Sequence, residues 1–313
     1  MEFFKKVTTF PFMHTRKVWY GVSSAAIVGS ILLLIFRGLN LGIDFTGGVV
    51  IEVAFSHAAD VERTRTALRE AGIVDAQVQQ IGTARDVMVR VLPQEEGANE
   101  ATKLGVRVIA ALKQVDPNVE LRRTDEVGAQ VGSELFNQGG LGLLVTFLLI
   151  GIYVAFRFVW RMGLGAVVAA LHDPFIILGF FSLTQITFDL SALAAILAII
   201  GYSLNDTVVV FDRIRDNFLA QRHMAPADVI DASVNQTLSR TVMTSGVTLM
   251  VVVVLLVFGG EALKSFASAL TVGIIVGTYS SIYVAGAIAL DLGLSIRDLL
   301  PIQKENSELD ALP

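Results

Sequence analysis

The chain has 313 residues, of which 53% are hydrophobic and only 17% are charged. Soluble domains carry about 25% charged residues, so this composition argues against a soluble globular protein. With no cysteine, disulfide bonds and thiolate metal sites are excluded. The four histidines show no metal-ligand spacing, and a formal net charge of −5 gives no indication of a nucleic-acid partner. We therefore expect no metal and no cofactor.

Six stretches of the sequence are nearly uncharged and long enough to cross a membrane as a helix, which takes about 20 apolar residues. The expected spans are residues 18–36, 137–156, 163–183, 190–211, 241–260 and 265–290. A cleaved signal peptide is the alternative for the first span. Its long apolar core and the lack of an A-x-A-like cleavage site favour a retained anchor.

The basic residues of the loops indicate the orientation of these spans. Lys and Arg gather in residues 1–17, in the loop at Arg157 and Arg161, in residues 212–240 and in the tail 291–313. The short loops on the other side carry only Lys264. Because positive loops stay in the cytoplasm, we expect both termini there, together with an amphipathic segment over residues 212–240.

The region from residue 37 to residue 136 has a different pattern and lies outside the cytoplasm in this topology. Its alternation of strand and helix patterns predicts the order βαββαβ, a ferredoxin-like α+β domain. The expected strands are 49–55, 76–81, 87–92 and 119–124, and the expected helices are 60–71 and 100–113, with a polar loop at 93–99. Asp60 is the expected N-cap of the first helix. The predicted fold class is a membrane bundle of six transmembrane helices with this domain inserted.

Two ionisable residues interrupt apolar segments near the cytoplasmic side. Asp206 lies about five residues, or roughly 8 Å, inside the end of the fourth span. Ionisable groups inside a membrane are costly and are functional hypotheses by default, and a buried carboxyl group can exchange a proton between two sides. Arg240, at the start of the fifth span, is a fixed positive charge that we expect to pair with Asp206. The structural alternatives are a hydrogen-bonded Asp and a snorkelling Arg.

A second polar group is expected in the third span, at His172-Asp173-Pro174, where the proline loosens the helix. Histidine can relay protons near neutral pH, so His172 and Asp173, with Asn205 beside Asp206, form a candidate relay. A polar contact that packs the third helix is the equally weighted alternative.

Long motifs accompany these residues in a fixed order. They are LGIDFTGG at 41–48, GYSLNDTVVVFDRIRDNF at 201–218, NQTLSRTVMTSGVT at 235–248, FGG at 258–260 and SSIYVAGAIAL at 280–290. Over nearly its whole length, the chain resembles the SecF subunits of bacterial protein translocases, in their short, separate form. These subunits belong to the SecD/SecF family of the resistance-nodulation-division superfamily.

The resemblance implies a non-enzymatic subunit of the bacterial inner membrane that completes preprotein export with the proton-motive force. It implies SecD and the SecYEG channel as partners, with YajC and YidC as accessory partners, and a periplasmic location for the domain at 37–136. Asp206 and Arg240 match the family's functional aspartate and arginine. The matched motif after the first span comprises Gly42, Asp44, Phe45, Thr46, Gly47 and Gly48.

Three alternatives stay open at this point. Asp173 and Asp206 on neighbouring spans fit a membrane aspartyl protease, although the Gly-x-Gly-Asp loop of such proteases is missing. Six spans with one small outside domain fit half of a proton-coupled small-molecule exporter. A passive scaffold for the channel is the third alternative.

Overall fold

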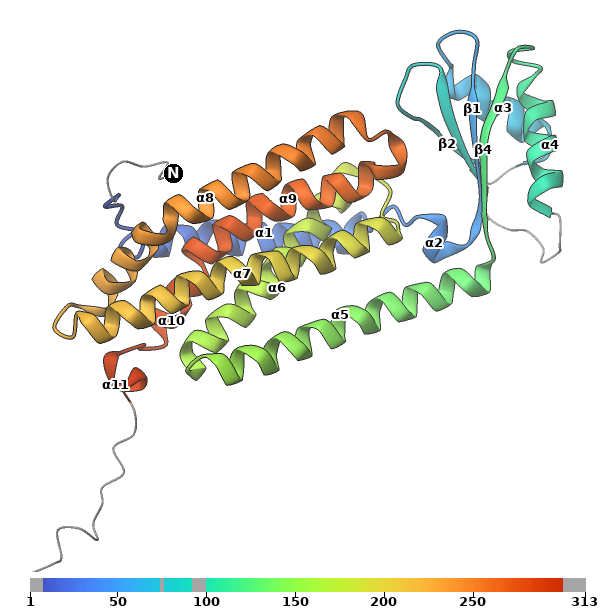
Figure 1. Cartoon of the computed structure of the whole chain (residues 1–313). Coiled ribbons are helices and arrows are strands. Elements are labelled where there is room, and N and C mark those ends of the chain that lie inside the picture. Colours follow the sequence, from blue (N-terminus) through green and yellow to red (C-terminus); the bar gives the residue numbers. More distant parts are fainter. Residues whose placement is uncertain (1–7, 74–75, 92–99, 301–313) are drawn as a thin grey trace, which may run out of the picture.

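The computed structural model describes residues 8–73, 76–91 and 100–300. It has two parts, a bundle of long helices and a small domain of strands and helices at one end of the bundle (Figure 1). Both described ends of the chain lie at the opposite end of the bundle. The fold is therefore a set of apolar helices with one inserted domain on one side.

Six helical segments in the described residues are long and apolar enough to cross a membrane. The long helices are α1 (Arg16–Phe36), α5 (Ala129–Arg157), α6 (Trp160–Thr184), α7 (Leu190–Ala220), α8 (Pro226–Phe258) and α9 (Glu261–Tyr283), with α10 (Ala285–Asp291) completing the sixth crossing. The helix α9 packs against α6, α7 and α8 and is the central element of the bundle. In contrast, α1, α5 and α8 lie at the outside of the bundle, since only 11%, 6% and 17% of the residues in their most apolar stretches are buried.

Several helices continue past the predicted spans. The expected separate amphipathic segment at 212–240 is instead the end of α7 and the beginning of α8, which meet in a short turn before Pro226. Proline is favoured at the first position of a helix because its missing N–H has no partner to lose there, and no Gly or Pro breaks either helix before that turn. The helix α5 is also longer than its predicted span, since it begins at Ala129, inside the region predicted as the outside domain.

The small domain has the element order β1 (Gly48–Ala54), α3 (Val61–Glu70), β2 (Gln77–Gln80), β3 (Asp86–Val91), α4 (Glu100–Leu112) and β4 (Glu120–Val127). Its strands form one antiparallel sheet in the order β2-β3-β1-β4. The predicted N-cap is confirmed, because Asp60 accepts bonds from the backbone N–H groups of Glu62 and Arg63 at 3.0 and 3.1 Å. The polar loop expected at 93–99 lies outside the described residues.

The alternation of apolar side chains explains why only one face of this sheet is covered. Ile51, Val53 and Val89 are fully buried, and they pack with Leu68 of α3 and Leu112 of α4. The side chains between them point to the other face, which turns toward the end of the helix bundle. The domain thus presents an open, polar sheet face to the membrane part of the protein.

Candidate functional site

Asp206 lies inside the bundle on α7. The residue is 5% exposed, and among the described residues its carboxylate has one hydrogen-bond donor, the Ser245 hydroxyl of α8, at 3.5 Å. This distance is at the outer limit for such a bond. A buried charged carboxylate normally needs several donors or a close counter-ion. Asp206 is therefore buried with fewer donors than a charged carboxylate normally has.

Arg240 lies on α8 and acts on Asp206 electrostatically. The predicted contact ion pair is not formed, since no Arg240 nitrogen lies within 4.0 Å of the Asp206 carboxylate in the described part of the chain. Arg240 and Asn205 are both exposed, so they face outward from the bundle while Asp206 faces inward. The structure thus brings Asp206 and Arg240 near each other and separates Asn205 from the buried carboxylate.

Asp173 on α6 has the opposite environment. It is fully buried, and its Oδ2 accepts bonds from the hydroxyls of Ser203 at 2.6 Å and Ser280 at 3.1 Å. Its Oδ1 lies 3.0 Å from Nδ1 of His172. Asp173 and Asp206 share no hydrogen-bond partner within the described part of the chain, so the paired-carboxylate arrangement of an aspartyl protease receives no support there.

His172 completes this second polar centre. It is 2% exposed, its ring lies against that of Tyr279, and its Nε2 has no partner among the described residues. A free ring nitrogen in the interior leaves one position open for a proton or a water molecule. Histidine and aspartate of the predicted relay are therefore in contact, as the sequence suggested, but they lie in a separate group from Asp206.

The central helix α9 connects the two centres through four consecutive side chains, residues 278–281. Each bonds to a different neighbouring helix, with distances of 2.7, 2.7, 3.1 and 3.0 Å in chain order. The pairs are Thr278 with Ser245 of α8, Tyr279 with Ser23 of α1, Ser280 with Asp173 of α6, and Ser281 with Thr207 of α7. Ser245 therefore links Asp206 to the same turn of α9 that holds Asp173.

Sequence reasoning did not identify these hydroxyl groups. Serine and threonine are common in membrane helices, where they also bond to their own backbone. The run of four hydroxyl-bearing residues at 278–281 is one signal in the sequence. Four consecutive side chains point in different directions around a helix, so they meet several neighbouring helices. The sequence alone does not say which neighbours they meet.

The motif at 41–48 forms a joint between the small domain and the bundle. Gly42 donates its N–H to the Phe188 carbonyl at 2.8 Å, and a Cβ there would lie 3.1 Å from that of Asp189. Asp44 accepts a bond at 2.9 Å from the N–H of Leu190, the first residue of α7. This carboxylate also lies at the positive end of the helix dipole, where a negative charge is favoured.

The next residues of the motif fix the joint to other elements. Phe45, in the short helix α2 (Ile43–Thr46), is buried and packs against the rings of Phe136 of α5 and Phe188. Thr46 accepts a bond from Arg90 of β3 at 2.6 Å. Gly47 has φ 68° and its N lies 2.6 Å from where a Cβ on Gly132 of α5 would be. The motif is thus held by α5, α7 and the sheet together.

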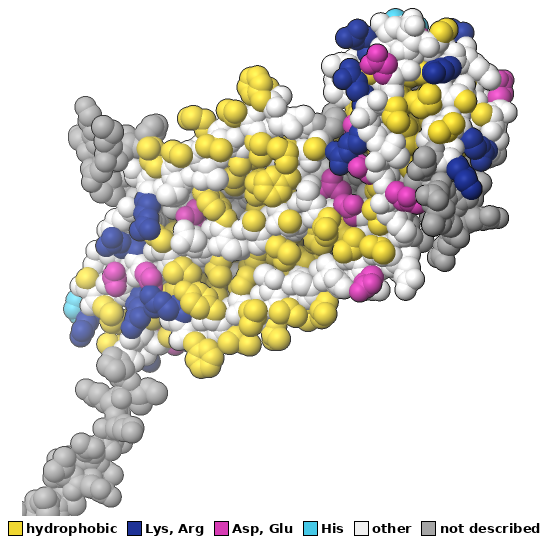
Figure 2. All heavy atoms as spheres, turned by 45° about the vertical axis from the view of Figure 1, so that its right-hand side comes forward, with side chains coloured by type: hydrophobic (Ala, Val, Ile, Leu, Met, Phe, Trp, Pro, Cys, Tyr) yellow, Lys and Arg dark blue, Asp and Glu magenta, His cyan; other side chains and the backbone are white. Residues whose placement is uncertain are grey.

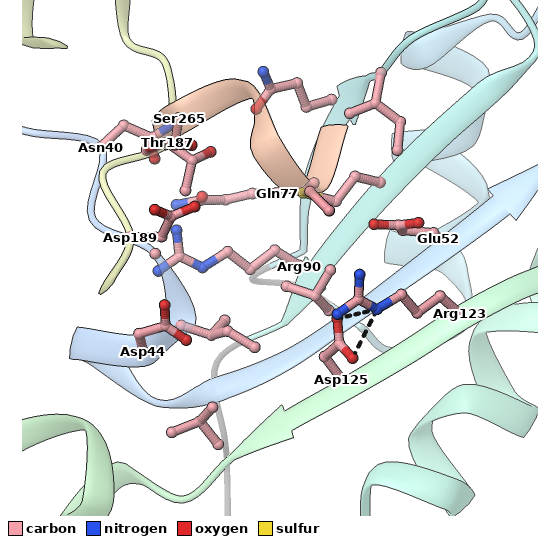
Figure 3. Close-up of a pocket in the computed structure, with 18 of the residues that line it drawn as sticks. Asn40, Asp44, Glu52, Gln77, Arg90, Arg123, Asp125, Thr187, Asp189 and Ser265 are labelled. Atoms are coloured by element: carbon pink, nitrogen blue, oxygen red, sulfur yellow. Dashed lines mark hydrogen bonds and ion pairs between the residues drawn. The ribbon is translucent and has the colours of Figure 1, made fainter. Parts of the chain in front are cut away.

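A cleft of about 560 Å³ lies beside this joint, between the open face of the sheet and the end of the bundle (Figure 3). Figure 3 shows the Arg90 side chain directed from β3 toward Asp44 and Asp189. Burial lowers the pKa of the Arg90 guanidinium. The wall of the cleft carries charges of both signs, and its Arg123 and Asp125 are paired with each other.

The fold and these two sites define a multi-pass membrane protein with a buried carboxyl centre and a joint to a small domain outside the membrane. Residues 107–295 match the family model "Protein export membrane protein SecD/SecF, C-terminal", and residues 32–59 match "SecD/SecF GG Motif". The chain belongs to the SecD/SecF family of protein-export membrane proteins, and it is a subunit of the Sec protein-export pathway.

Curated relatives match the whole length of the chain. It is 49% identical to the protein translocase subunit SecF of Vibrio alginolyticus, over 100% of this chain and 99% of that protein. The corresponding subunit of Pseudomonas aeruginosa is 44% identical, over 96% of this chain and 97% of that protein.

Two solved structures match as well. A crystal structure of SecDF from Thermus thermophilus, a translocon-associated membrane protein, matches with a TM-score of 0.82 and 36% identity, over 91% of this chain. SecDF in a super-membrane-facing form matches with a TM-score of 0.68 over the same share. In both comparisons this chain spans only 39% of the SecDF chain.

Proposed function

We propose that this subunit, together with SecD, uses the proton-motive force to complete preprotein translocation across the bacterial inner membrane. The observation that carries the proposal is the environment of Asp206, a buried carboxyl group with one long hydrogen bond and a fixed positive charge nearby. Such a group can exist charged or neutral, with different preferred packing in each state. Protonation from one side and release to the other would then drive a cycle of two arrangements.

The joint at 41–48 supports a path from this carboxyl group to the outside. Asp206 lies on α7, and Asp44 binds the first N–H of that same helix. A shift of α7 that follows a change of charge at Asp206 would therefore reach the small domain directly. The unequal match to the two SecDF structures is in keeping with a family whose members adopt more than one arrangement.

An uncovered face of α7 supports SecD as the partner. Along it lie exposed small residues, Ala194, Ala198 and Gly201, followed by Asn205, with Arg240 of α8 beside them. Small residues let membrane helices approach closely, and a Cβ on Gly201 would have open space around it. A charged side chain facing lipid is costly, so Arg240 is best accommodated if a partner's helix covers this face.

Other parts of the proposal rest on family resemblance and loop charge. They are SecYEG, YajC and YidC as further partners, cytoplasmic termini, and a periplasmic position for the small domain. The strand order and element order support a ferredoxin-like class for this domain. A proton relay through His172, Asp173 and Asn205 stays a prediction, and Asn205 would take part in it only from the outer face of α7.

The experiment that tests the proposal is gradient-dependent export in inverted vesicles that carry Asp206→Asn with wild-type SecD. Asparagine keeps the shape of the side chain but cannot titrate. We expect the gradient-dependent part of late-stage preprotein release to disappear, with normal amounts of the subunit and normal co-purification of SecD. Full gradient response in this variant would remove Asp206 from the mechanism.

The partner face has its own test. Gly201→Leu places a large side chain on the face assigned to SecD, whereas Gly140→Leu makes the same change at an exposed glycine of α5 with equally open surroundings. We expect only Gly201→Leu to reduce co-purification of SecD. Equal recovery of SecD with both variants would mean that this face is not the contact.

A further inference from the structure

A cavity of about 210 Å³ lies at the end of the bundle opposite the small domain. Its walls come from the end of α5, the start of α6, the last turns of α7 and the short helix α11 (Ile296–Leu299). Two guanidinium groups, those of Arg157 and Arg215, line it together with the apolar side chains of Phe158 and Met162. The cavity therefore has a cationic part and an apolar part.

The charges around this cavity do not cancel. Arg157 is paired with Asp212 through one of its nitrogens, and Asp298, the one carboxylate among the lining residues described, is paired with Arg161. Within residues 8–73, 76–91 and 100–300, no carboxylate or carbonyl accepts a bond from the exposed Arg215. The guanidinium of Arg157 keeps further donors beyond its bond to Asp212. The three arginines and two aspartates around the cavity leave a net charge of one positive unit. The donors that remain free belong to Arg157 of α5 and Arg215 of α7.

The cavity lies at the level where a membrane meets water. Trp160, at the turn between α5 and α6, is 61% exposed, and tryptophan is enriched at this level. Figure 2 shows Lys and Arg side chains gathered at this end of the bundle, beside a broad apolar surface. Exposed apolar side chains continue from there along α5, among them Leu148, Leu144 and Leu141.

We propose that this cavity binds the headgroup of an anionic glycerophospholipid. The phosphate lies between Arg157 and Arg215, and the acyl chains lie along the exposed face of α5. Basic pockets between helices at the membrane surface bind such headgroups, and guanidinium groups fit phosphate oxygens geometrically. A zwitterionic headgroup fits less well, because its ammonium group would add a positive charge next to two guanidiniums. This site is independent of the proposed proton coupling.

The apolar wall and the adjacent face of α5 favour a lipid over a soluble phosphate. A free phosphate ion needs donors on all sides, whereas Phe158 and Met162 offer none. A phosphodiester with two chains uses both the cationic and the apolar part of the site. A lipid headgroup and a free phosphate ion would both bind the arginines through phosphate oxygens, and competition with inorganic phosphate distinguishes them.

The test uses the full chain, purified in detergent and mixed with equal amounts of phosphatidylglycerol and phosphatidylethanolamine with identical acyl chains. Native mass spectrometry counts the lipids that remain bound. We expect the wild-type protein to retain phosphatidylglycerol preferentially. Arg215→Gln should weaken this retention about fivefold, the effect of removing one arginine near a membrane surface. Arg213→Gln, an exposed arginine of the same helix that does not line the cavity, should leave retention unchanged.

Three results would overturn the proposal. Equal retention of the two lipids by the wild-type protein would remove the preference for an anionic headgroup. Equal retention of phosphatidylglycerol by Arg215→Gln and wild type would place the lipid elsewhere. Displacement of phosphatidylglycerol by inorganic phosphate alone would make the cavity a site for soluble anions. Circular dichroism checks the folding of both variants, and if Arg215→Gln is misfolded it is replaced by Arg215→Ala, which removes the same charge and should weaken retention to the same extent.

Discussion

Asp173 and Asp206 are buried carboxyl groups on neighbouring helices, and their hydrogen bonds differ. Asp173 is bound by two hydroxyl groups and a histidine, at distances between 2.6 and 3.1 Å. Asp206 has one hydroxyl at 3.5 Å. Burial alone therefore does not describe the surroundings of a carboxyl group inside the bundle. The number and length of its hydrogen bonds do, because each short bond holds the carboxylate in place.

The largest effect on stability is expected at Asp173. Asp173→Ala leaves Ser203 and His172 without their partner, whereas Ser280 still donates to the Gly277 carbonyl, and each buried unsatisfied group costs about 1–3 kcal/mol. Asp206→Ala removes only one long bond and should cost much less. Thermal unfolding of the purified variants in detergent measures both. Similar unfolding temperatures for the two variants would contradict the distinction between the carboxylates.

Substitutions of Arg240 test the role of the positive charge near Asp206. Arg240→Met removes the fixed positive charge and should eliminate the gradient-dependent part of export. Arg240→Lys keeps the charge but loses the planar geometry of the guanidinium, so we expect an intermediate response. Arg213→Met is the matched control, an exposed arginine of α7 near the same side of the membrane. If Arg240→Met and Arg213→Met behave alike in export assays, the charge of Arg240 has no specific role.

A smaller effect is expected at the joint, because the Asp44 carboxylate there makes one bond to the start of α7. Asp44→Asn weakens the bond to Leu190 and removes the negative charge at the positive end of the α7 dipole, at a cost of about 0.3–1 kcal/mol. Asp60→Asn weakens a similar cap of α3, which lies entirely within the small domain. We expect only Asp44→Asn to reduce gradient-dependent export. An equal loss with Asp60→Asn would show that general destabilisation, and not the joint, is responsible.

The smallest effect concerns Asp116, which resembles Asp173 but lies in the small domain outside the membrane. The backbone N–H of Ser56 donates to it at 2.6 Å, and with the Ser56 hydroxyl and the N–H of Asn118 it holds the pKa of this carboxyl below its usual range. A lowered folded-state pKa adds stability that is present above the pKa of the unfolded chain and is lost as the pH falls through the folded-state value.

Asp116→Asn should therefore flatten the acid end of the stability curve of the small domain and leave the bundle unaffected. Hydrogen exchange of the full chain, followed in the domain and in the bundle as the pH is lowered, measures this. An unchanged acid dependence of exchange in the domain would show that Asp116 is not held in its charged form by these donors.

Much of the architecture could be predicted from the sequence, because long apolar stretches and alternating strands follow simple periodicity. The helix boundaries could not, since nothing in the sequence stops α7 at the membrane surface or delays α5 until its apolar part begins. The site was predicted in part. Asp206 and His172-Asp173 stand out as polar interruptions, but the environments that distinguish them come from hydroxyl groups on α7, α8 and α9. Which helices those groups meet depends on the packing of the bundle, and that packing also turns Asn205 outward.

The central claim is that Asp206 is the carboxyl group that exchanges a proton. Infrared difference spectroscopy of the purified full chain, recorded as the pH is changed, detects the C=O stretch of each carboxyl group that takes up a proton. The account predicts that one band from a buried carboxyl disappears in Asp206→Asn and remains in Asp173→Asn. A band that persists in Asp206→Asn and is lost in Asp173→Asn would contradict it, and would make the His172–Asp173 centre the site of proton uptake.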